Sequence, residues 1–574
     1  MIQTKLENFE AENTARLFEI LNENKDTVLG KQLQLETIKT VEEFRAKVPV
    51  TRYPFYKELI ERCTNGEQGI MCSQKIEYFA TSSGTTGRHK MIPVTKNVVG
   101  DIRKVVSPAL GIVVQNSLRS VEMKSLARGS MLNPGLNLLH YPTTKGGTRY
   151  GPLSQSKNAF RSLLARLQWK MMDSLVAGAP GDLVDQLNHF ETAMLLHLLF
   201  GLADEEVNRI YMTFGPGLSH FFGLMPTYGE QMLNILQSNR LADFPLFKEH
   251  IPAHIQLALE FRLKRSFRSG EQRKKRVEFL REEFNKGFEG IVPRIWQKME
   301  VVTASVSGSF QVHEAMIRYY IGHLPLSGAV YIASEGSLGF QADVDKNTYF
   351  LHPATVFYEF IPESEIPNEN PATLLYNQLK VGEKYELLIT TISGFLRYRV
   401  GDVIEVLDSS SSPYLKHVPR IQISYRTGSI LDAYGEKTTE IHVVSALQLA
   451  CEEWNNMNGT SHFSFCEFTC FLQLNESPVR YYIFVEMDFL IQPMNLDVID
   501  AQLRKINGFY DHCRAQNKIG PLKIFIVKSA AFAEFKNLLI LEGAAPLQVK
   551  IPRLISKPEH VEFLSTRSVA NLFN

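Results

Sequence analysis

The stretch ATSSGTTGRHKMIPVT (Ala80–Thr95) concentrates five hydroxyl residues and two glycines ahead of a single lysine, Lys90. Glycines let consecutive backbone N–H groups converge on one point and form an anion-binding nest. The hydroxyl groups add hydrogen-bond donors, and the lysine adds a positive charge. This composition favours a loop that grips phosphate and leaves through a β-like segment, MIPVT.

Two other interpretations, a P-loop and a flexible linker, compete with this kind of phosphate-binding loop. A P-loop ends in Gly-Lys-Ser/Thr, whereas here His89 precedes Lys90 and Met91 follows it, so that motif fails. A flexible linker would also be rich in serine and glycine. A linker is not expected to hold Lys90 and Pro93 within a β-like segment at its end. This stretch alone nevertheless leaves both the linker and the phosphate-binding loop open.

Two later stretches favour a nucleotide. YIASEGSLGF (Tyr331–Phe340) ends a β-rich run in a turn with one acid, Glu335, which is suited to Mg²⁺ beside phosphates. GFLRYRVGDVIEV (Gly394–Val406) places Arg397 and Arg399 two apart on a predicted strand, so we expect both on one face. Asp402 follows and suits a pair of ribose hydroxyls. Each feature alone is equally consistent with an exposed strand end or an ordinary Gly-Asp turn.

Length and composition indicate a globular protein of at least two domains. The chain has 574 residues, 44% of them apolar, with a net charge of +1, so no general attraction to nucleic acid or to an anionic membrane is expected. The six cysteines form no CxxC pair, and the N-terminus lacks a signal peptide, which favours a cytoplasmic location. The apolar run ETAMLLHLLFGLA predicts a buried helix. The basic segment Phe261–Arg276 is interpreted as a solvated helix pair, with nucleic-acid binding as the less favoured alternative.

The pattern of periodicities predicts a mixed α/β chain. Residues 158–300 have mostly helical periodicity, and the region after residue 300 is rich in β-strand patterns. The tail predicts a compact α+β unit, including one helix over residues 496–513. A glycine-containing polar stretch near residues 425–437 suggests a boundary. We therefore predict a large N-terminal domain, residues 1–425, with several subdomains, and a small C-terminal domain, residues 426–574.

Taken together and in order, these motifs resemble the auxin-responsive acyl-acid amido synthetases, a branch of the adenylate-forming (acyl-CoA synthetase/luciferase-like) superfamily. The family motif SSGTSxGxxK stands here as Ser82–Lys90, a Tyr-x-x-Ser-Glu turn as Tyr331–Glu335, and YRYRVGDV as Leu396–Val403. The segments FRAKVPVTRYPFY and GAAPLQVKIPRLISKPEHVEFLSTRSV also match. The resemblance covers nearly the whole chain, and its departures, such as Ala333 and Leu396, remove no charge.

The resemblance implies a two-step ligase that uses ATP and Mg²⁺. A small carboxylic acid attacks the α-phosphorus of ATP to give an acyl-adenylate and pyrophosphate, and an amino acid amine then displaces AMP to give an amide. Glu335 would bind the metal. The residues expected at ATP or AMP are Ser82, Ser83, Gly84, Thr85, Thr86, Lys90, Ala333, Ser334, Glu335, Gly336, Tyr358, Arg399 and Asp402.

The resemblance also implies that residues 1–425 form the adenylation domain and that residues 426–574 form a mobile lid, which carries a lysine to the α-phosphate. Lys550, in QVKIPR, is the first candidate, and Lys437, in GEKTTE, is the second. Arg149 is a candidate partner of the substrate carboxylate. Transfer of the acyl group to coenzyme A or another thiol is the alternative reaction, and a non-catalytic nucleotide- or acid-binding protein is the alternative from another class. We expect a monomer that has no nucleic-acid or membrane partner.

Overall fold

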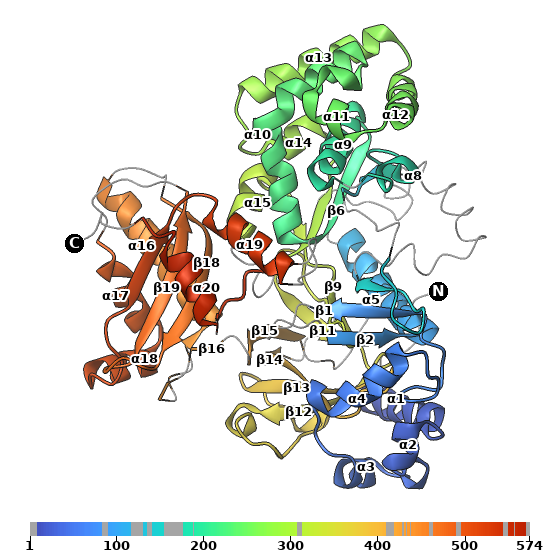
Figure 1. Ribbon diagram of the computed structural model, residues 1–574, viewed down its shortest axis with the longest axis vertical. Coiled ribbons are helices and arrows are strands. Elements are labelled where there is room, and N and C mark those ends of the chain that lie inside the picture. Colours follow the sequence, from blue (N-terminus) through green and yellow to red (C-terminus); the bar gives the residue numbers. More distant parts are fainter. Residues whose placement is uncertain are drawn as a thin grey trace.

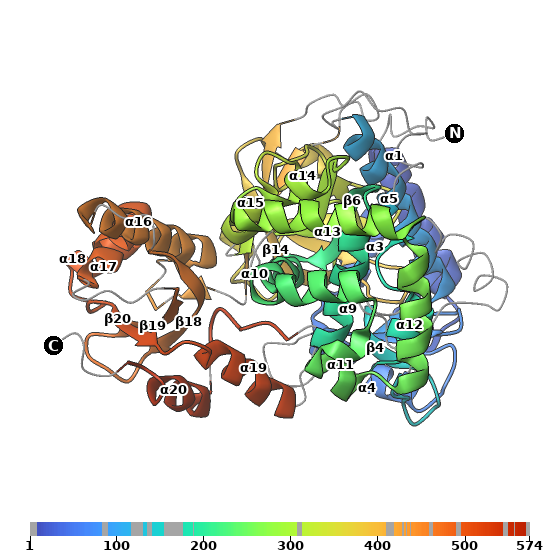
Figure 2. The same cartoon turned by 90° about the horizontal axis from the view of Figure 1, so that it is seen from above.

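The structure is a computed structural model. It describes residues 9–82, 90–115, 130–134, 141–153, 176–187, 189–306, 313–408, 418, 420–427, 430–431, 433–434, 436, 438–458, 463–488, 495–542, 549–555 and 557–569. The α/β fold with a large N-terminal part and a smaller C-terminal unit is confirmed (Figure 1). The C-terminal unit lies to one side of the remainder of the chain in both views (Figures 1 and 2).

A seven-stranded sheet is the central element of the N-terminal part. Its strand order is β12-β13-β14-β15-β11-β10-β9, and every pairing is antiparallel. The strands are β9 (Val330–Ile332), β10 (Ser337–Gln341), β11 (Thr348–Leu351), β12 (Phe357–Pro362), β13 (Lys384–Thr390), β14 (Tyr398–Asp408) and β15 (Arg420–Arg426). Its core is shared with the first helices, α1 (Phe9–Asn24), α2 (Val28–Gln32), α3 (Val41–Lys47) and α4 (Tyr53–Thr64).

A second sheet and a short third sheet complete the N-terminal part. The second is parallel, with order β5-β3-β6-β7-β8, and the third has order β2-β1-β4. Their strands are β1 (Tyr78–Ser82), β2 (Lys90–Val94), β3 (Ser130–Leu132), β4 (Tyr150–Pro152), β5 (Val176–Ala177), β6 (Val207–Phe214), β7 (Val301–Ser305) and β8 (Leu326–Ser327).

Helices build a separate core around the parallel sheet. They are α8 (Gly181–Val184), α9 (Phe190–Ala203), α10 (Gly215–Ser238), α11 (Pro245–His250), α12 (Ala253–Arg265), α13 (Gly270–Asn285), α14 (Ile291–Ile295) and α15 (Glu314–Ile321). By contrast, α5 (Lys96–Gln115) packs into the core of the seven-stranded sheet, beside β9 and β10. The predicted buried helix is α9, whose residues are apolar on all sides and pack into this core. The predicted run of helices is interrupted by β6, whose apolar residues are buried within the parallel sheet.

The C-terminal unit is a three-stranded sheet, β18-β19-β20, covered by helices. Its elements are β16 (Ile430–Leu431), β17 (Thr438–Thr439), α16 (Glu440–Asn458), β18 (Phe465–Gln473), β19 (Arg480–Met487), α17 (Asp497–Ile506), α18 (Gly508–Ala515), β20 (Lys523–Val527), α19 (Ala531–Leu541) and α20 (Pro558–Ser565). The single helix predicted over residues 496–513 is wrong. Asn507 divides it, because its side chain accepts hydrogen bonds from the N–H groups of Phe509 and Tyr510 and so starts a new helix.

Two further expectations concern composition. All six cysteines are free thiols. Among the helices that the structure describes, none is long and apolar enough to cross a membrane.

The entry to β14 is held by two buried arginines, and their carboxylate partners, Glu359 and Glu386, lie on one face of the sheet, in keeping with the predicted shared face. Arg397 precedes the strand with a left-handed φ of 45°. Its Nη2 lies 2.8 Å from Glu359 of β12, whereas the guanidinium of Arg399 pairs with Glu386 of β13. The two arginines therefore tie β14 to two different carboxylates.

The Arg399–Glu386 pair generates a stability prediction. Both side chains are almost fully buried, so Arg399→Met leaves a carboxylate in the core without its cation. We expect the free energy of unfolding to fall by about 3–5 kcal/mol, and the double variant Arg399→Met/Glu386→Leu to recover most of it. Urea denaturation of the N-terminal part measures both. Glu67→Ala, at the exposed Arg62–Glu67 pair, is the control and should change stability by less than about 1 kcal/mol. A similar loss in the single and double variants would contradict this account.

Candidate active site

Lys90, Glu335 and Tyr398 meet at the junction of three elements. Lys90 begins β2, Tyr398 begins β14, and Glu335 lies in the turn between β9 and β10. The Tyr398 hydroxyl donates to Glu335 Oε1 at 2.9 Å and accepts from Lys90 Nζ at 3.1 Å, while Lys90 Nζ lies 3.8 Å from Glu335 Oε1. The tyrosine therefore joins the loop lysine to the proposed metal ligand.

The pKa values of Tyr398 and Lys90 are both shifted by burial and by the charge of Glu335. Burial, reinforced by the negative charge of Glu335, raises the pKa of Tyr398 far above its ordinary value, so the hydroxyl stays a donor. Burial lowers the pKa of Lys90, and the attraction of Glu335 opposes that shift. The Lys90 ammonium also lies 5.5 Å from the ring centre of Tyr53, which gives it a favourable cation–π contact.

Asp402 is held by a second tyrosine. The Tyr331 hydroxyl donates to Asp402 Oδ2 at 2.8 Å, and Arg426 Nε lies 3.5 Å from Asp402 Oδ1. Asp402 and Arg426 are cross-strand partners on β14 and β15, which explains their proximity. Burial, followed by the charge of Asp402, raises the pKa of Tyr331 well above its ordinary range, so this hydroxyl also remains a donor.

Gly401, directly before Asp402, allows the backbone of β14 to pair closely with β15. Gly401 has a φ of 91°, and its carbonyl accepts from Thr427 N at 2.8 Å. A side chain at this position would be strained at that φ and would lie 3.2 Å from Thr427 Oγ1. The glycine in the Val-Gly-Asp sequence therefore allows β14 and β15 to stay paired where Asp402 emerges.

The turn that carries Glu335 is closed by its own backbone. Ala333 N donates to Gly336 O at 2.9 Å, and Gly336 N donates to Ala333 O at 3.2 Å. A Cβ on Gly336 would lie 3.0 Å from Val356 Cγ1, so the close approach favours glycine. Ser334 is half-buried at the apex beside Glu335. The turn thus presents Ala333, Ser334, Glu335 and Gly336 as one unit.

The predicted phosphate loop begins and ends at this site. Ser82 is the last residue of β1 and pairs across the hairpin with Lys90, so the two ends of the loop lie together. Ser83, Gly84, Thr85 and Thr86 lie outside the described residues, as does Lys437. Their predicted roles remain predictions.

Lys550 reaches the same region from the C-terminal unit. Its ammonium lies 5.5 Å from the ring centre of Phe214, at the end of β6 in the N-terminal part. Burial lowers the pKa of Lys550 to about 8; the positive charge of Arg426 adds to the shift, and Asp402 opposes it. A cavity between the two parts is lined by Pro216, His313, Glu467, Lys536, Val549, Lys550, Ile551 and Arg553. Lys550 therefore lies at the interface and within electrostatic reach of the Asp402 cluster.

Three predicted site residues lie elsewhere. Tyr358 is buried in the core, where its hydroxyl donates to Leu338 O, so it offers almost no surface to an adenine ring. Arg399 is occupied by Glu386 and by two backbone carbonyls, so it braces the sheet and is not directed at phosphate. Arg149 is exposed, and its carbonyl accepts from Phe79 N near the start of β1, at the opposite end of that strand from Ser82.

The structure also identifies residues to which the sequence assigned no role. Tyr331 and Tyr398 occur within the quoted motifs, but aromatic residues in β-rich segments are typical of a core; Arg426 lies in the stretch that was interpreted as a domain boundary. Their hydroxyl and guanidinium groups become informative only when β9, β14 and β15 are known to be parts of one sheet. In the sequence, only the closeness of the two tyrosines to the motif acids Glu335 and Asp402 could have indicated a role for them.

Comparison with known families matches most of the chain in three consecutive parts. The GH3 family N-terminal domain matches residues 1–326, the GH3 family central domain matches residues 349–426, and the GH3 family C-terminal domain matches residues 441–559.

Curated relatives align over nearly their full lengths. An indole-3-acetic acid-amido synthetase GH3.3 of Arabidopsis thaliana is 27% identical, over 97% of this chain and 91% of the relative. A jasmonoyl–L-amino acid synthetase GH3.5 of Oryza sativa subsp. japonica is 26% identical, over 93% of this chain and 90% of the relative.

Solved structures share the fold. A GH3.15 acyl acid amido synthetase superposes with a TM-score of 0.79 and 22% identity, covering 98% of this chain and 94% of that chain. A 2-hydroxyisobutyryl-CoA ligase in a postadenylation state superposes with a TM-score of 0.50 and 12% identity, covering 98% of this chain and 93% of that chain.

The Tyr331–Asp402 contact generates a binding prediction. If Asp402 receives ribose hydroxyls, Tyr331 orients it, and Tyr331→Phe removes one hydrogen bond to a charged group. We expect ATP affinity, measured by calorimetry, to fall roughly tenfold, equivalent to about 1.5 kcal/mol. Tyr358→Phe is the matched control: it also removes a buried hydroxyl, but it should leave ATP affinity unchanged. Equal losses in the two variants would contradict the assignment of both tyrosines.

Proposed function

The chain belongs to the GH3 family, and from this premise we propose that it is an ATP-dependent acyl-acid amido synthetase. It activates a small carboxylic acid as an acyl-adenylate with release of pyrophosphate. It then joins the acyl group to the amine of an amino acid and releases AMP. The observation that carries this proposal is the convergence of Lys90, Glu335, Asp402 and Lys550, from four separate segments, on one region.

Adenylation requires that negative charge be neutralised and that the acid and ATP be held in line. Lys90 stands at the end of the loop that the resemblance assigns to phosphate, and Asp402 keeps oxygen lone pairs for the ribose. These groups are fixed in advance by Tyr398 and Tyr331. Preorganised positioning and electrostatic stabilisation supply most of the catalysis in such reactions.

A magnesium ion fits the donor set at Glu335. The Glu335 side chain is buried, and Oε1 carries the hydrogen bond from Tyr398. No group of three potential ligating side chains occurs among the described residues, and Mg²⁺ characteristically uses one or two carboxylates together with substrate phosphates and water. Glu335 would therefore hold the ion, which supplies neutralisation of phosphate charge when bound.

Lys550 is proposed to bring a positive charge to the α-phosphate from the C-terminal lid, residues 426–574. Its position between Phe214 and the Asp402 cluster supports this role. A closed lid also excludes water, which would otherwise hydrolyse the acyl-adenylate. We further propose a monomer located in the cytoplasm; the six free thiols are consistent with a reducing compartment.

The proposed reaction is tested by pyrophosphate release from Mg·ATP. A panel of aromatic, indolic and fatty carboxylic acids is assayed with and without each of the twenty amino acids. We expect one class of acid to release pyrophosphate and one or a few amino acids to give an amide, identified by mass spectrometry. Release that yields a thioester with coenzyme A and no amide would favour the thiol alternative. ATP binding without release from any acid would favour a non-catalytic protein.

The environment of Lys550 predicts the pH dependence of adenylation. The charged ammonium is the form that neutralises phosphate, so activity should be full below pH 8 and fall as pH rises through about 8. The groups whose charges act on it are Asp402, Arg426, Glu440 and Arg553, and those that share its cavity are His313, Glu467 and Lys536. The alkaline limb is measured in kcat/KM for ATP without amino acid, which reports the free enzyme.

Two variants test whether the titration of Lys550 causes the loss of activity at alkaline pH. Lys550→Ala should slow adenylation by about 100-fold or more, because a charge at the transition state is lost. Lys550→Arg keeps its charge at all these pH values, so any remaining activity should show no limb near pH 8. A limb that persists in Lys550→Arg belongs to another group and would remove Lys550 from this role.

A further inference from the structure

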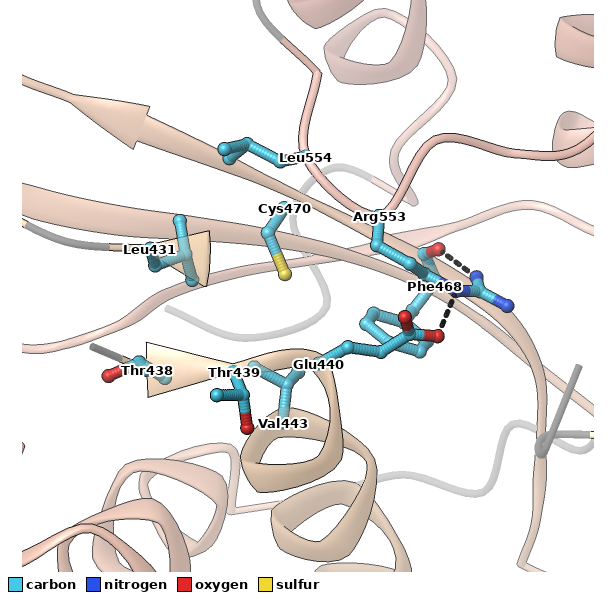
Figure 3. Close-up of a pocket in the computed structure, with 9 residues that line it drawn as sticks. All are labelled: Leu431, Thr438, Thr439, Glu440, Val443, Phe468, Cys470, Arg553 and Leu554. Atoms are coloured by element: carbon cyan, nitrogen blue, oxygen red, sulfur yellow. Dashed lines mark hydrogen bonds and ion pairs between the residues drawn. The ribbon is translucent and has the colours of Figure 1, made fainter. Parts of the chain in front are cut away.

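Arg553 lies three residues after Lys550 and is the most heavily bonded side chain of the closing segment, residues 549–555. Its Nε is 2.9 Å from Glu440 Oε1, and its Nη1 pairs with Glu467 and donates to Phe468 O at 2.7 Å. The guanidinium carbon also lies 4.4 Å from the ring centre of Phe468. Figure 3 shows the arginine extending from the closing segment toward Glu440 at the start of α16.

The backbone around Arg553 is fixed as well. Cys470 N donates to Arg553 O, and Ile555 N donates to Cys470 O, each at 2.9 Å, so the segment pairs with the edge of β18. Thr469 Oγ1 donates to Pro552 O, and Ile551 is buried in a core with Phe535. Proline restricts φ, so the link between Arg553 and Lys550 is short and stiff.

We propose that Arg553 is a positioning residue of the ligase, which sets the place of the Lys550 ammonium by clamping the closing segment to Glu440 and Glu467. This inference rests on the proposed function, because Arg553 acts through Lys550. Arg553 is 6% exposed and fully engaged, so it does not itself contact substrate.

The chemistry of the clamp requires arginine. Two carboxylates on different elements and one carbonyl accept from a single planar group, and the rigid fork of guanidinium supplies donors in those directions. A lysine keeps the charge but offers a point donor that cannot span both acids in the same way. Loss of the charge removes the cation that lies between Glu440 and Glu467.

Glu440 lies near the point where the chain passes from the N-terminal part into the C-terminal unit. It is the first residue of α16 and directly follows Thr438 and Thr439, which form β17 of the C-terminal unit. β15 of the seven-stranded sheet ends at Arg426. Arg553 therefore ties Lys550 to the beginning of the C-terminal unit, so that the lysine moves with the unit and not independently of it.

The variants Arg553→Lys and Arg553→Gln test the inference, with Arg514→Lys as the matched control. Arg514 forms a partly buried pair with Asp500 in the same unit, with 2.8 Å between Nη2 and Oδ2, but it lies outside the closing segment. All three variants disturb an ion pair that is largely shielded from solvent, and all three should lower the unfolding temperature of the C-terminal unit. Only the Arg553 variants should change the position and the pKa of the Lys550 ammonium.

The first readout is pyrophosphate release with the full-length enzyme below its unfolding temperature. In Arg553→Lys we expect kcat to fall roughly ten- to a hundredfold, because displacement of a catalytic group by about 1 Å has an effect of that size. The alkaline limb should also move upward, toward the ordinary range of a solvated lysine. Arg514→Lys should keep both kcat and the limb.

The second readout does not depend on activity. Competitive labelling of amines with acetic anhydride, followed by mass spectrometry, measures the titration and accessibility of Lys550 directly. We expect faster labelling and a higher titration midpoint in both Arg553 variants, with no change in Arg514→Lys. Unchanged Lys550 labelling in both would overturn the inference even if the enzyme is active. Altered labelling in an enzyme that releases no pyrophosphate with any acid would support the clamp and contradict the proposed function.

Discussion

The anchoring of β14 by Arg397, the residue directly before it, is the constraint on which the site depends. Arg397, in a left-handed conformation, places two guanidinium nitrogens at 2.8 and 2.9 Å from Glu359. The same guanidinium donates to the carbonyls of Arg45 and Val48, at the end of α3. Arg397 thus joins a helix, β12 and β14 at one buried point. Tyr398 follows immediately and Asp402 four residues later, so the functional side chains inherit their positions from this anchor.

A common electrostatic arrangement follows along β14. Each of the two motif acids, Glu335 and Asp402, accepts from a tyrosine hydroxyl whose pKa is raised by burial. A hydroxyl that cannot ionise here fixes the direction of a carboxylate without cancelling its charge. The acids therefore keep lone pairs for the proposed metal ion and ribose hydroxyls, while Lys90 and Arg426 lie at the longer distances of 3.8 and 3.5 Å from Glu335 and Asp402.

The sequence predicted that this region is rich in β-strands, because apolar residues and turn residues alternate clearly there. It predicted the convergence of the acids only through the resemblance to known ligases, since no local pattern shows that β9 and β14 belong to one sheet. Arg399 was misjudged for a physical reason: a positive charge beside a nucleotide motif has the same local sequence signature whether it meets phosphate or a buried Glu386. Tyr358 failed similarly, because a core tyrosine and a ring-stacking tyrosine look alike until burial is known.

Lys550 differs from the other site residues because it belongs to a unit with its own cores, separate from those of the sheets it approaches. A lysine on a long flexible stem would reach across such an interface in many conformations, and its charge would be spread over all of them. The closing segment removes that freedom by pairing with β18 and by burying Ile551 and Arg553 on either side of Pro552. With the lysine fixed to its unit, its distance from the Asp402 cluster is set by the placement of the whole unit. If the C-terminal unit rotates as the proposed lid, it would add or withdraw a positive charge in a single step, which suits the proposed reaction, whose two halves need different charge at the same phosphate.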